Sequence, residues 1–327
     1  MSDRDDARWL GAALALAERG VGRTSPNPSV GCVIVADDRV VGRGWTQPGG
    51  RPHAEAMALA AAGDAARGAT AYVTLEPCAH VSARGPACSD SLIAAGIARV
   101  VASGIDPDPR TAGAGIARLR AAGITVDVVA QPAAERLNAG FFTRQRHGRA
   151  HVTLKLAVSL DGCIALPDGT SRWITGAPAR RHAHLERARC DLIVVGGGTL
   201  VADDPALDVR LDGLEDRAPR RAVLSRSLEV IPAGARIGEA LLVRDLDDLD
   251  PAILTVLVEG GAAVATTLLA ADCVDRLLIY RAPILIGGRH SIGDLGLADL
   301  SSAHGRWRLA AALTLGPDRV EEYDRVR

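Results

Sequence analysis

The chain has 327 residues, 48% of them hydrophobic, which is enough for two domains that each have a core. The formal net charge of −1 and the pI of about 6.7 argue against a sequence-independent nucleic-acid binder, whose surface would be basic. The six cysteines lack the spacing of a disulfide framework and favour a reducing cytoplasm. The N-terminus lacks the basic region of a secretory signal, and no apolar run is long enough to span a membrane. We therefore expect a cytoplasmic protein without a membrane or nucleic-acid partner.

The first part of the chain alternates helix and strand patterns. Residues 5–19 are amphipathic and are followed by glycines, as a helix C-terminus prefers. Two apolar runs on either side of Asp37-Asp38 predict a β-hairpin over 32–45. The patterns that follow predict a helix beginning near His53, a strand over 71–75, a helix over 88–96, and a later strand over 125–129. This alternation is typical of a layered α/β domain.

Three side chains between positions 53 and 88 have the chemistry of a zinc site. His53 supplies an imidazole, and Cys78 and Cys88 supply thiolates, all of which zinc binds readily. Three protein ligands leave one position open for water, and bound zinc lowers the pKa of that water. Glu55 lies two residues after the histidine, which predicts a carboxylate that shuttles protons without binding the metal. The order H-x-E, P-C and a second cysteine is that of zinc deaminases.

Two other arrangements of these residues remain open at this point. A closed structural zinc site needs a fourth cysteine or histidine, and the nearby candidates are Cys32 and His80. The other alternative is that the cysteines are buried and inert.

A second α/β pattern follows the basic stretch 143–151, which has no apolar periodicity. We interpret this stretch as the junction between two domains, 1–146 and 147–327. The expected strands lie over 152–165, 191–198, 220–225, 240–244, 255–261 and two runs near the C-terminus, with helices over 177–190 and 262–272 and a loop over 199–210.

This second half contains features typical of a dinucleotide- or phosphate-binding enzyme domain. Glycines follow strands in VVGGGTL and VEGGAAV, where a backbone is able to approach phosphates, although simple tight turns have the same pattern and G-x-G-x-x-G is absent. Lys155 is the only lysine of an arginine-rich chain and lies in an apolar strand, where an unpaired ammonium is costly. Its candidate partners are Asp161, Asp203 and Glu259. Trp173 either stacks on a ligand ring or belongs to the core.

With these motifs the chain resembles the RibD family of bifunctional riboflavin-biosynthesis deaminase–reductases over nearly its whole length. TSPNPSVGCVIV, PHAEAMAL and EPCAH with the following cysteine resemble the deaminase half of the family. VTLKLAVSLDG, WITG, GTLVADDPALDVR and VEGG resemble the reductase half. Both sets of motifs occur in the order that the family has.

The resemblance implies two folds and two activities. The first domain would have the three-layer α/β/α fold of cytidine deaminases and would use Zn²⁺ to deaminate a phosphorylated pyrimidine, 2,5-diamino-6-(5-phosphoribosylamino)pyrimidin-4-one. The second would have a dihydrofolate-reductase-like α/β fold and would use NADPH to reduce the ribosyl group to ribityl. Family members usually associate, so we expect a homo-oligomer, either a dimer or a tetramer. The rival hypotheses are a nucleoside or base deaminase with an appended nucleotide-binding domain, and a zinc-stabilised structural protein.

The resemblance also implies roles for individual residues. In the deaminase half, the zinc ligands are His53, Cys78 and Cys88, the proton shuttle is Glu55, the pyrimidine contact is Asn27, and the basic residue near the substrate phosphate is Arg84. In the reductase half, Lys155 would contact the substrate and position or protonate it. The implied NADPH contacts are Ala157, Trp173, Thr199, Asp203 and Gly261, and the implied substrate contacts are Ser171, Arg187, Leu207, Arg210 and Glu259.

The chain departs from the family pattern at three places near the deaminase site. Thr46 stands where the family often has histidine, and Asp108 stands where it usually has asparagine. The loop between Cys78 and Cys88 is slightly longer than usual. These departures concern the expected substrate contacts and leave the zinc chemistry unchanged.

Overall fold

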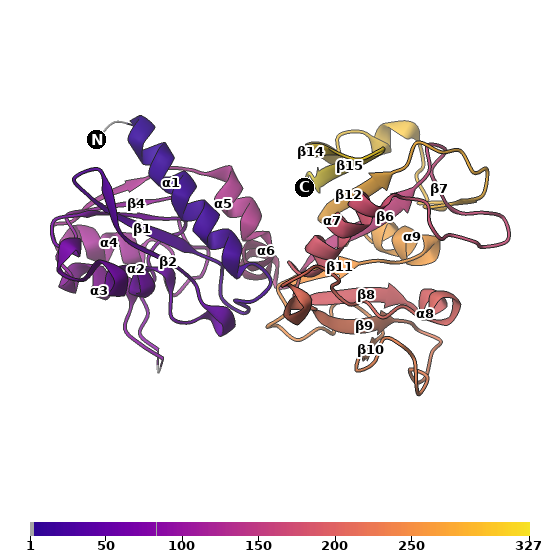
Figure 1. Ribbon diagram of the computed structural model, residues 1–327, viewed down its shortest axis with the longest axis horizontal. Helices are drawn as coiled ribbons and strands as arrows, with labels where there is room; N and C mark the ends of the chain where they lie inside the picture. The colour runs from indigo at the N-terminus through magenta and orange to yellow at the C-terminus, as the bar shows by residue number, and fades with distance from the viewer. Residues whose placement is uncertain (1–2, 83) are drawn as a thin grey trace. The chain divides into compact units, whose positions relative to one another are not determined.

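The computed structural model describes residues 3–82 and 84–327. The chain divides into two compact units, Met1–Arg149 and Ala150–Arg327 (Figure 1). This division falls slightly later than the predicted boundary after residue 146. The reason is that α6 (Ala139–His147) extends into the basic stretch, and Gly148, which has a left-handed conformation, follows its last residue. The first part of the basic stretch is therefore helical, and the boundary between the units falls near its end.

The first unit is built on a five-stranded sheet. Its strands are β1 (Gly31–Ala36), β2 (Arg39–Trp45), β3 (Thr70–Val73), β4 (Arg99–Ala102) and β5 (Thr125–Val128), in the order β2-β1-β3-β4-β5. Its helices, besides α6, are α1 (Asp3–Ala17), α2 (Ala54–Ala62), α3 (Cys88–Ala94), α4 (Ala114–Ala121) and α5 (Pro132–Leu137), with 3₁₀ turns η1 (Glu18–Gly20), η2 (Pro48–Gly50) and η3 (Gly63–Ala66). The antiparallel pairing of β1 with β2 confirms the predicted hairpin.

Helices pack on both faces of this sheet because two glycines let them approach the strands. A Cβ on Gly31 would lie 1.8 Å from the carbonyl oxygen of Ala13 in α1. A Cβ on Gly44 would lie 2.4 Å from the carbonyl oxygen of Ala54 in α2. Gly44 is paired with Cys32, the neighbour of Gly31, and successive residues of a strand face opposite sides. Thus α1 and α2 cover opposite faces, which confirms the predicted three-layer α/β/α architecture.

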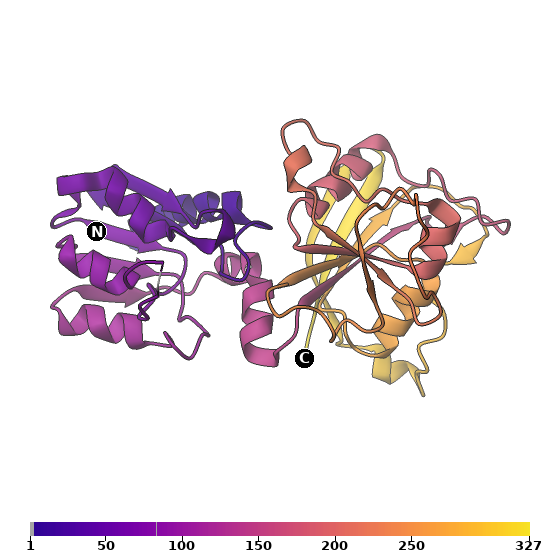
Figure 2. The ribbon, with the colours of Figure 1, turned by 90° about the horizontal axis from the view of Figure 1, so that it is seen from below.

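The second unit is built on an eight-stranded sheet, whose twist is visible in Figure 2. Its strands are β6 (His151–Val158), β7 (Cys163–Ala165), β8 (Leu192–Gly196), β9 (Arg220–Leu224), β10 (Leu241–Val243), β11 (Thr255–Val258), β12 (Arg276–Arg281), β13 (Arg289–His290), β14 (Trp307–Leu315) and β15 (Asp318–Arg325). The order is β10-β9-β8-β11-β6-β12-β15-β14, and β7 pairs separately with β13. Its helices are α7 (Ala177–Arg187), α8 (Gly197–Asp203) and α9 (Ala262–Ala270), with 3₁₀ turns η4 (Glu215–Arg217) and η5 (Leu300–Ala303).

Alternate side chains of β12 show how helices cover both faces of this sheet. Leu278 and Tyr280 pack with Ala179 and Ala183 of α7. Leu277 instead belongs to the cluster that contains the apolar side chains of α9. Strands from β10 to β12 in the sheet order are parallel, so their carboxyl ends meet at one edge, where α/β proteins bind ligands. The α/β class predicted for this half is confirmed.

One local prediction in this half is wrong. The stretch 199–210 was expected to be a loop, but its first residues belong to helix α8. The helix ends at Asp203, and the next residue, Asp204, adopts a left-handed conformation with φ of 39°. The sequence Gly-Gly-Thr-Leu-Val-Ala contains too few residues for a helical period to be recognised.

Across residues 3–82 and 84–327, the structure has no helix with both the length and the apolar character that crossing a membrane requires.

Candidate active sites

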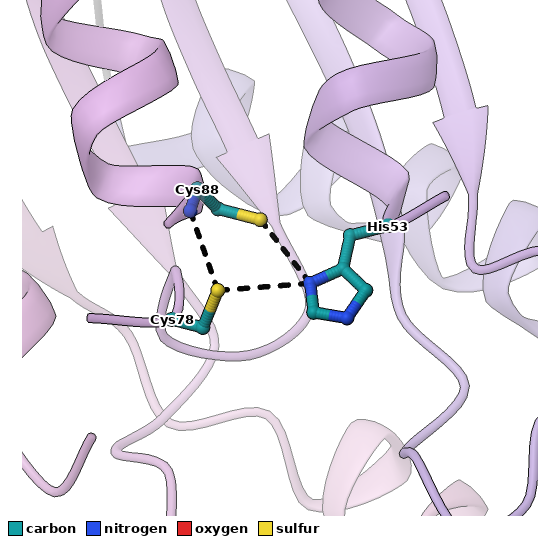
Figure 3. A group of neighbouring side chains, drawn as sticks. All are labelled: His53, Cys78 and Cys88. Carbon is teal, nitrogen blue, oxygen red and sulfur yellow. Dashed lines mark hydrogen bonds between the residues drawn. The ribbon is translucent and has the colours of Figure 1, made fainter. Parts of the chain in front are cut away.

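The predicted zinc ligands of the first unit come together at the starts of two helices (Figure 3). His53 is the residue that precedes α2, Cys88 is the first residue of α3, and Cys78 lies in the loop after β3. The His53 Nδ1 atom is 3.3 Å from Cys88 Sγ and 3.6 Å from Cys78 Sγ. The Cys88 backbone N–H donates a hydrogen bond of 3.3 Å to Cys78 Sγ.

These distances fit a tetrahedral metal. Zinc–nitrogen and zinc–sulfur bonds of ordinary length separate a nitrogen and a sulfur ligand by about 3.6 Å. Among the described residues, the group of side chains able to hold a metal here has three members, with ligand atoms within 4.8 Å of one another. Neither Cys32 nor His80 belongs to it. The set therefore has the form of a catalytic zinc site, which keeps one position open, and not that of a closed structural site.

The pKa values of the two thiols shift in opposite directions. The Cys88 thiol hydrogen-bonds to Cys78, and this contact together with His53 and the Cys88 backbone N–H lowers the pKa of Cys78 well below its usual value. The same contact, reinforced by burial, raises the pKa of Cys88. Cys78 is thus ready to bind as a thiolate, and the second proton leaves when metal binds.

Glu55 is buried in the first turn of α2, with an exposed fraction of 3%. Burial raises the pKa of its carboxyl group, while the neighbouring His53 opposes that shift. A side-chain contact with Cys88 places the carboxyl group beside the metal ligands. A carboxylate whose pKa is raised towards neutrality both accepts and returns a proton readily.

Asn27 and Arg84 lie beside this cluster, around a glycine turn. Asn27 Nδ2 is 3.0 Å from His53 Nε2, and it also donates a hydrogen bond of 3.2 Å to the carbonyl oxygen of Gly50. Arg84 Nη1 donates to the carbonyl oxygen of Gly49 at 3.0 Å. Gly50 has φ of 83°, and a Cβ there would lie 2.7 Å from Asn27 Cγ, so the turn requires glycine. The Pro-Gly-Gly sequence signals a turn, but it does not reveal which side chains the turn connects.

The structure gives two departures from the family pattern a local role. The Thr46 hydroxyl is buried, accepts the Val30 N–H at 3.0 Å and thereby joins two loops. Asp108 is held by Arg110 through both carboxylate oxygens, at 3.0 Å from Nε, and this contact lowers the pKa of Asp108. The paired arginine offsets the charge that a carboxylate adds in place of a neutral asparagine.

The second unit has a cavity of about 670 Å³ at the carboxyl ends of its parallel strands. All the residues expected to act in the reductase half contribute to its lining. They are Lys155, Ala157, Ser171, Trp173, Arg187, Thr199, Asp203, Leu207, Arg210, Glu259 and Gly261. These residues span more than a hundred positions of sequence, and the meeting of β6, β8 and β11 in one sheet brings them together.

A buried ion-pair network lies at the base of this cavity. Of the three candidate partners named from the sequence, Lys155 contacts Glu259, and its Nζ lies 3.6 Å from Oε2. Arg187 holds the same carboxylate through Nε at 2.6 Å and Nη2 at 3.0 Å, and its Nη1 donates to the carbonyl oxygen of Asp208 at 2.9 Å. Burial alone would raise the pKa of Glu259, but the two cations lower it to about 2. All three guanidinium nitrogens of Arg187 thus bind protein groups, whereas the Arg210 side chain is 62% exposed.

The structure adds residues that sequence reasoning missed. The Tyr280 ring lies below the Lys155 ammonium, with Nζ 5.8 Å from the ring centroid, and the Tyr280 hydroxyl is 2.8 Å from His182 Nδ1. Trp173 is 65% exposed, which excludes a core role, and the Arg180 guanidinium stacks on its ring at 4.6 Å. The sequence contains no signal for such contacts, because they depend on strand register and helix packing.

Comparison with known proteins assigns both units. A family model described as the cytidine and deoxycytidylate deaminase zinc-binding region matches residues 3–103, and one described as the RibD C-terminal domain matches residues 150–320. The riboflavin biosynthesis protein RibD of Escherichia coli K12 is 42% identical over 326 residues, covering 86% of this chain and 89% of that protein. The RibD protein of Mycobacterium tuberculosis H37Rv is 39% identical and covers 94% of both. The chain belongs to the RibD family.

Solved RibD structures agree with this assignment. The Acinetobacter baumannii RibD structure has a TM-score of 0.90 and 34% identity, and it covers 99% of both chains. A structure from Thermotoga maritima has a TM-score of 0.87 and 30% identity, again over 99% of both chains. The RibD assignment made from sequence motifs is confirmed, and the chain is a bifunctional riboflavin-biosynthesis enzyme with deaminase and reductase activities.

The residues present fit the two cofactors of RibD enzymes, zinc and NADPH. The nitrogen and two sulfurs described above are a zinc donor set. At the second site, α8 and α9 both begin at glycines, Gly196 and Gly261, that provide no side-chain cap. Gly261 and the first residues of α9 line the cavity, so backbone N–H groups at this helix start are available to the phosphates of a dinucleotide.

Replacement of Glu259 by glutamine tests the ion-pair network. At pH 7 we expect a loss of roughly 3–5 kcal/mol in the free energy of unfolding, which is typical when one partner of a buried ion pair is removed. Because the pKa of Glu259 is about 2 in the folded state and ordinarily 4.5, its contribution is present above pH 4.5 and is lost as the pH falls towards 2. The difference between wild type and variant should therefore narrow on acidification, as measured by urea unfolding.

The control for this experiment is Glu229→Gln, because Glu229 is an exposed carboxylate in the same unit. This variant should match the wild type at every pH. A Glu259→Gln protein that is as stable as the wild type at pH 7, or a difference that does not change with pH, would contradict the network.

Proposed function

We propose that the first unit deaminates 2,5-diamino-6-(5-phosphoribosylamino)pyrimidin-4-one and that the second unit then reduces the ribosyl group of the product to ribityl. The observation that carries this proposal is the pairing of a three-ligand metal site beside Glu55 with a separate cavity built around Lys155 and Glu259. The Thermotoga maritima relative is named a diaminohydroxyphosphoribosylaminopyrimidine deaminase and 5-amino-6-(5-phosphoribosylamino)uracil reductase, which supports the order of the two steps.

In the deamination step, bound zinc would activate water as the nucleophile. Glu55 would take the first proton from this water and pass it to the ring nitrogen next to the amino-bearing carbon. It would then take the second proton from the added hydroxyl group and pass it to the amino group, which leaves as ammonia while the carbonyl forms. Its burial beside the metal ligands keeps the carboxylate within reach of both groups. Asn27 holds the pyrimidine, and Arg84 contacts the phosphate at the exposed end of the site.

In the reduction step, NADPH would supply the hydride to C1′ of the ring-opened sugar imine or an equivalent form. Lys155 donates the accompanying proton or positions the group that receives it, together with Asp203. Arg187 is held by Glu259, whereas Arg210 has an exposed side chain that pairs with Asp208 at 3.4 Å and would bind the substrate phosphate. Ser171 and Leu207 complete the substrate side of the cavity, and the cofactor side is formed by Ala157, Trp173, Thr199, Asp203 and Gly261.

Replacement of Glu55 by glutamine separates metal binding from proton transfer. We expect the variant to retain zinc, because Glu55 is not a ligand, and to lose ammonia release by at least about 100-fold, the usual contribution of a general acid–base. Metal content is measured by atomic absorption, and the product is followed by mass spectrometry with and without NADPH. Full ammonia release by this variant, or activity of the wild type on cytidine instead, would contradict the assignment.

Replacement of Lys155 by methionine tests the second site independently. NADPH oxidation with the deaminated substrate should fall to the background rate, since methionine has similar length but no proton to donate. Ammonia release should equal that of the wild type, because Lys155 lies in the other unit. Glu55→Gln serves as the reciprocal control, with reduction of added deaminated substrate retained. Persistence of NADPH oxidation in the lysine variant would show that Lys155 has no such role.

We also propose that the chain forms homo-oligomers through strand β14. In the described part of the chain this strand is the last of its sheet, so one edge lacks a neighbour. It exposes Leu309 (52%) and Leu313 (44%), and Arg308 is its single charged residue. Exposed edges of monomeric proteins are usually blocked by charges or proline. An antiparallel pair of β14 strands related by a two-fold axis would place Leu309 of one copy near Leu313 of the other.

Introduction of a charge at this apolar edge tests the interface. We expect the wild type to have a multiple of the 34.0 kDa chain mass in light scattering after gel filtration, and Leu313→Arg to have a lower mass. Leu285→Arg is the matched control, because Leu285 is 74% exposed outside β14. An unchanged mass for Leu313→Arg, or a monomeric wild type, would exclude this interface.

A further inference from the structure

Arg51 lies directly before the Pro52-His53 segment that carries the first metal ligand. Its side chain is half-buried. Within residues 3–82 and 84–327, no carboxylate forms an ion pair with its guanidinium, and no protein acceptor receives a hydrogen bond from it. Partial burial of an unpaired cation is unfavourable in a protein unless a ligand of opposite charge offsets it.

The guanidinium of Arg51 lies against the loop between the two cysteines. A Cβ on Gly85 would lie 3.4 Å from Arg51 Nη1, so the arginine occupies the space that a side chain there would require. Arg84 precedes Gly85 in this loop, and its Nη1 donates to the carbonyl oxygen of Gly49, two residues before Arg51. The two arginines therefore come from opposite loops and meet beside the His53 and Cys88 segments.

A third arginine near the metal ligands is already neutralised. Arg110 is held by both oxygens of the buried Asp108. Arg84, in contrast, has its described hydrogen bond to a neutral carbonyl group, and Arg51 has no described acceptor. Of these three arginines, Arg51 and Arg84 are therefore the two without a carboxylate partner among residues 3–82 and 84–327.

We propose that Arg51 acts with Arg84 as a two-arginine clamp on the phosphate of the deaminase substrate. Guanidinium groups bind phosphate oxygens through pairs of charge-assisted hydrogen bonds, and two of them from different loops would fix both its position and its direction. Arg51 is a specificity-determining residue, since it makes the site prefer a phosphorylated pyrimidine ribosylamine to its dephosphorylated counterpart. This inference rests on the proposed deaminase function.

The test measures ammonia release by the full-length zinc enzyme without NADPH. The substrates are the phosphorylated compound and the same compound after phosphatase treatment. We expect Arg51→Ala to raise KM for the phosphorylated substrate by about 10-fold or more, the effect of losing charge-assisted hydrogen bonds, with kcat nearly unchanged. The values of kcat/KM for the dephosphorylated substrate should equal those of the wild type. Arg84→Ala should behave in the same way.

Arg39→Ala is the matched control, because Arg39 is an exposed arginine at the start of β2. The loops of the site follow only after this strand ends at Trp45. This variant should leave both substrates unaffected. An Arg51→Ala enzyme with unchanged KM, or with an equal loss on both substrates, would overturn the clamp, since the second result is that of a purely structural residue.

Binding of inorganic phosphate separates this inference from the deaminase assignment. Calorimetric titration of the full chain should show phosphate binding that Arg51→Ala weakens by about 10-fold. If the wild type bound phosphate in this manner but released no ammonia from the substrate, the proposed function would fail and the clamp would stand. If phosphate bound equally well to both proteins, the clamp would fail regardless of activity.

Discussion

Both active sites depend on helix starts that no side chain caps. The helices α2, α3, α8 and α9 begin after His53, Ala87, Gly196 and Gly261, and none of these residues caps its helix with a side chain. The first N–H groups of a helix need acceptors and favour negative charge. In the first unit Cys88 N–H donates to Cys78 Sγ, which helps to hold a thiolate. In the second unit the start of α9 lines the cavity at the carboxyl ends of the parallel strands.

Each unit buries one glutamate of its site, and the charges around the two glutamates differ. Around the metal ligands, burial raises the pKa of the Glu55 carboxyl group although the His53 ring opposes this shift, and the residue is suited to carrying a proton. Around the reductase cavity, Glu259 is buried with Lys155 and Arg187, so its pKa falls and it remains ionised. We propose that the first carboxylate moves a proton, while the second contacts two cations. Desolvation acts on both, and the neighbouring charges decide the outcome.

Departures from the family pattern are compensated locally in this chain. Asp108 has the charge that an asparagine lacks, and Arg110, two residues later in the chain, neutralises it by binding both carboxylate oxygens. Thr46 has no imidazole to offer to a substrate, and its hydroxyl instead ties its loop to Val30. The first change is neutralised and the second is absorbed by the scaffold, and we propose that Arg51 and Arg84 on the two neighbouring loops bind the phosphate end of the substrate.

The sequence alone determined the α/β class and the three zinc ligands, and it predicts roles for the neighbouring glutamate and the single lysine. These features are local, since strand and helix periods, ligand chemistry and H-x-E spacing lie within short segments. Tertiary structure alone decided that Lys155 pairs with Glu259 and not with Asp161 or Asp203, and that Arg187 binds that same carboxylate. Such contacts join segments far apart in the chain, and strand register and side-chain direction decide which groups meet. No local pattern encodes either quantity.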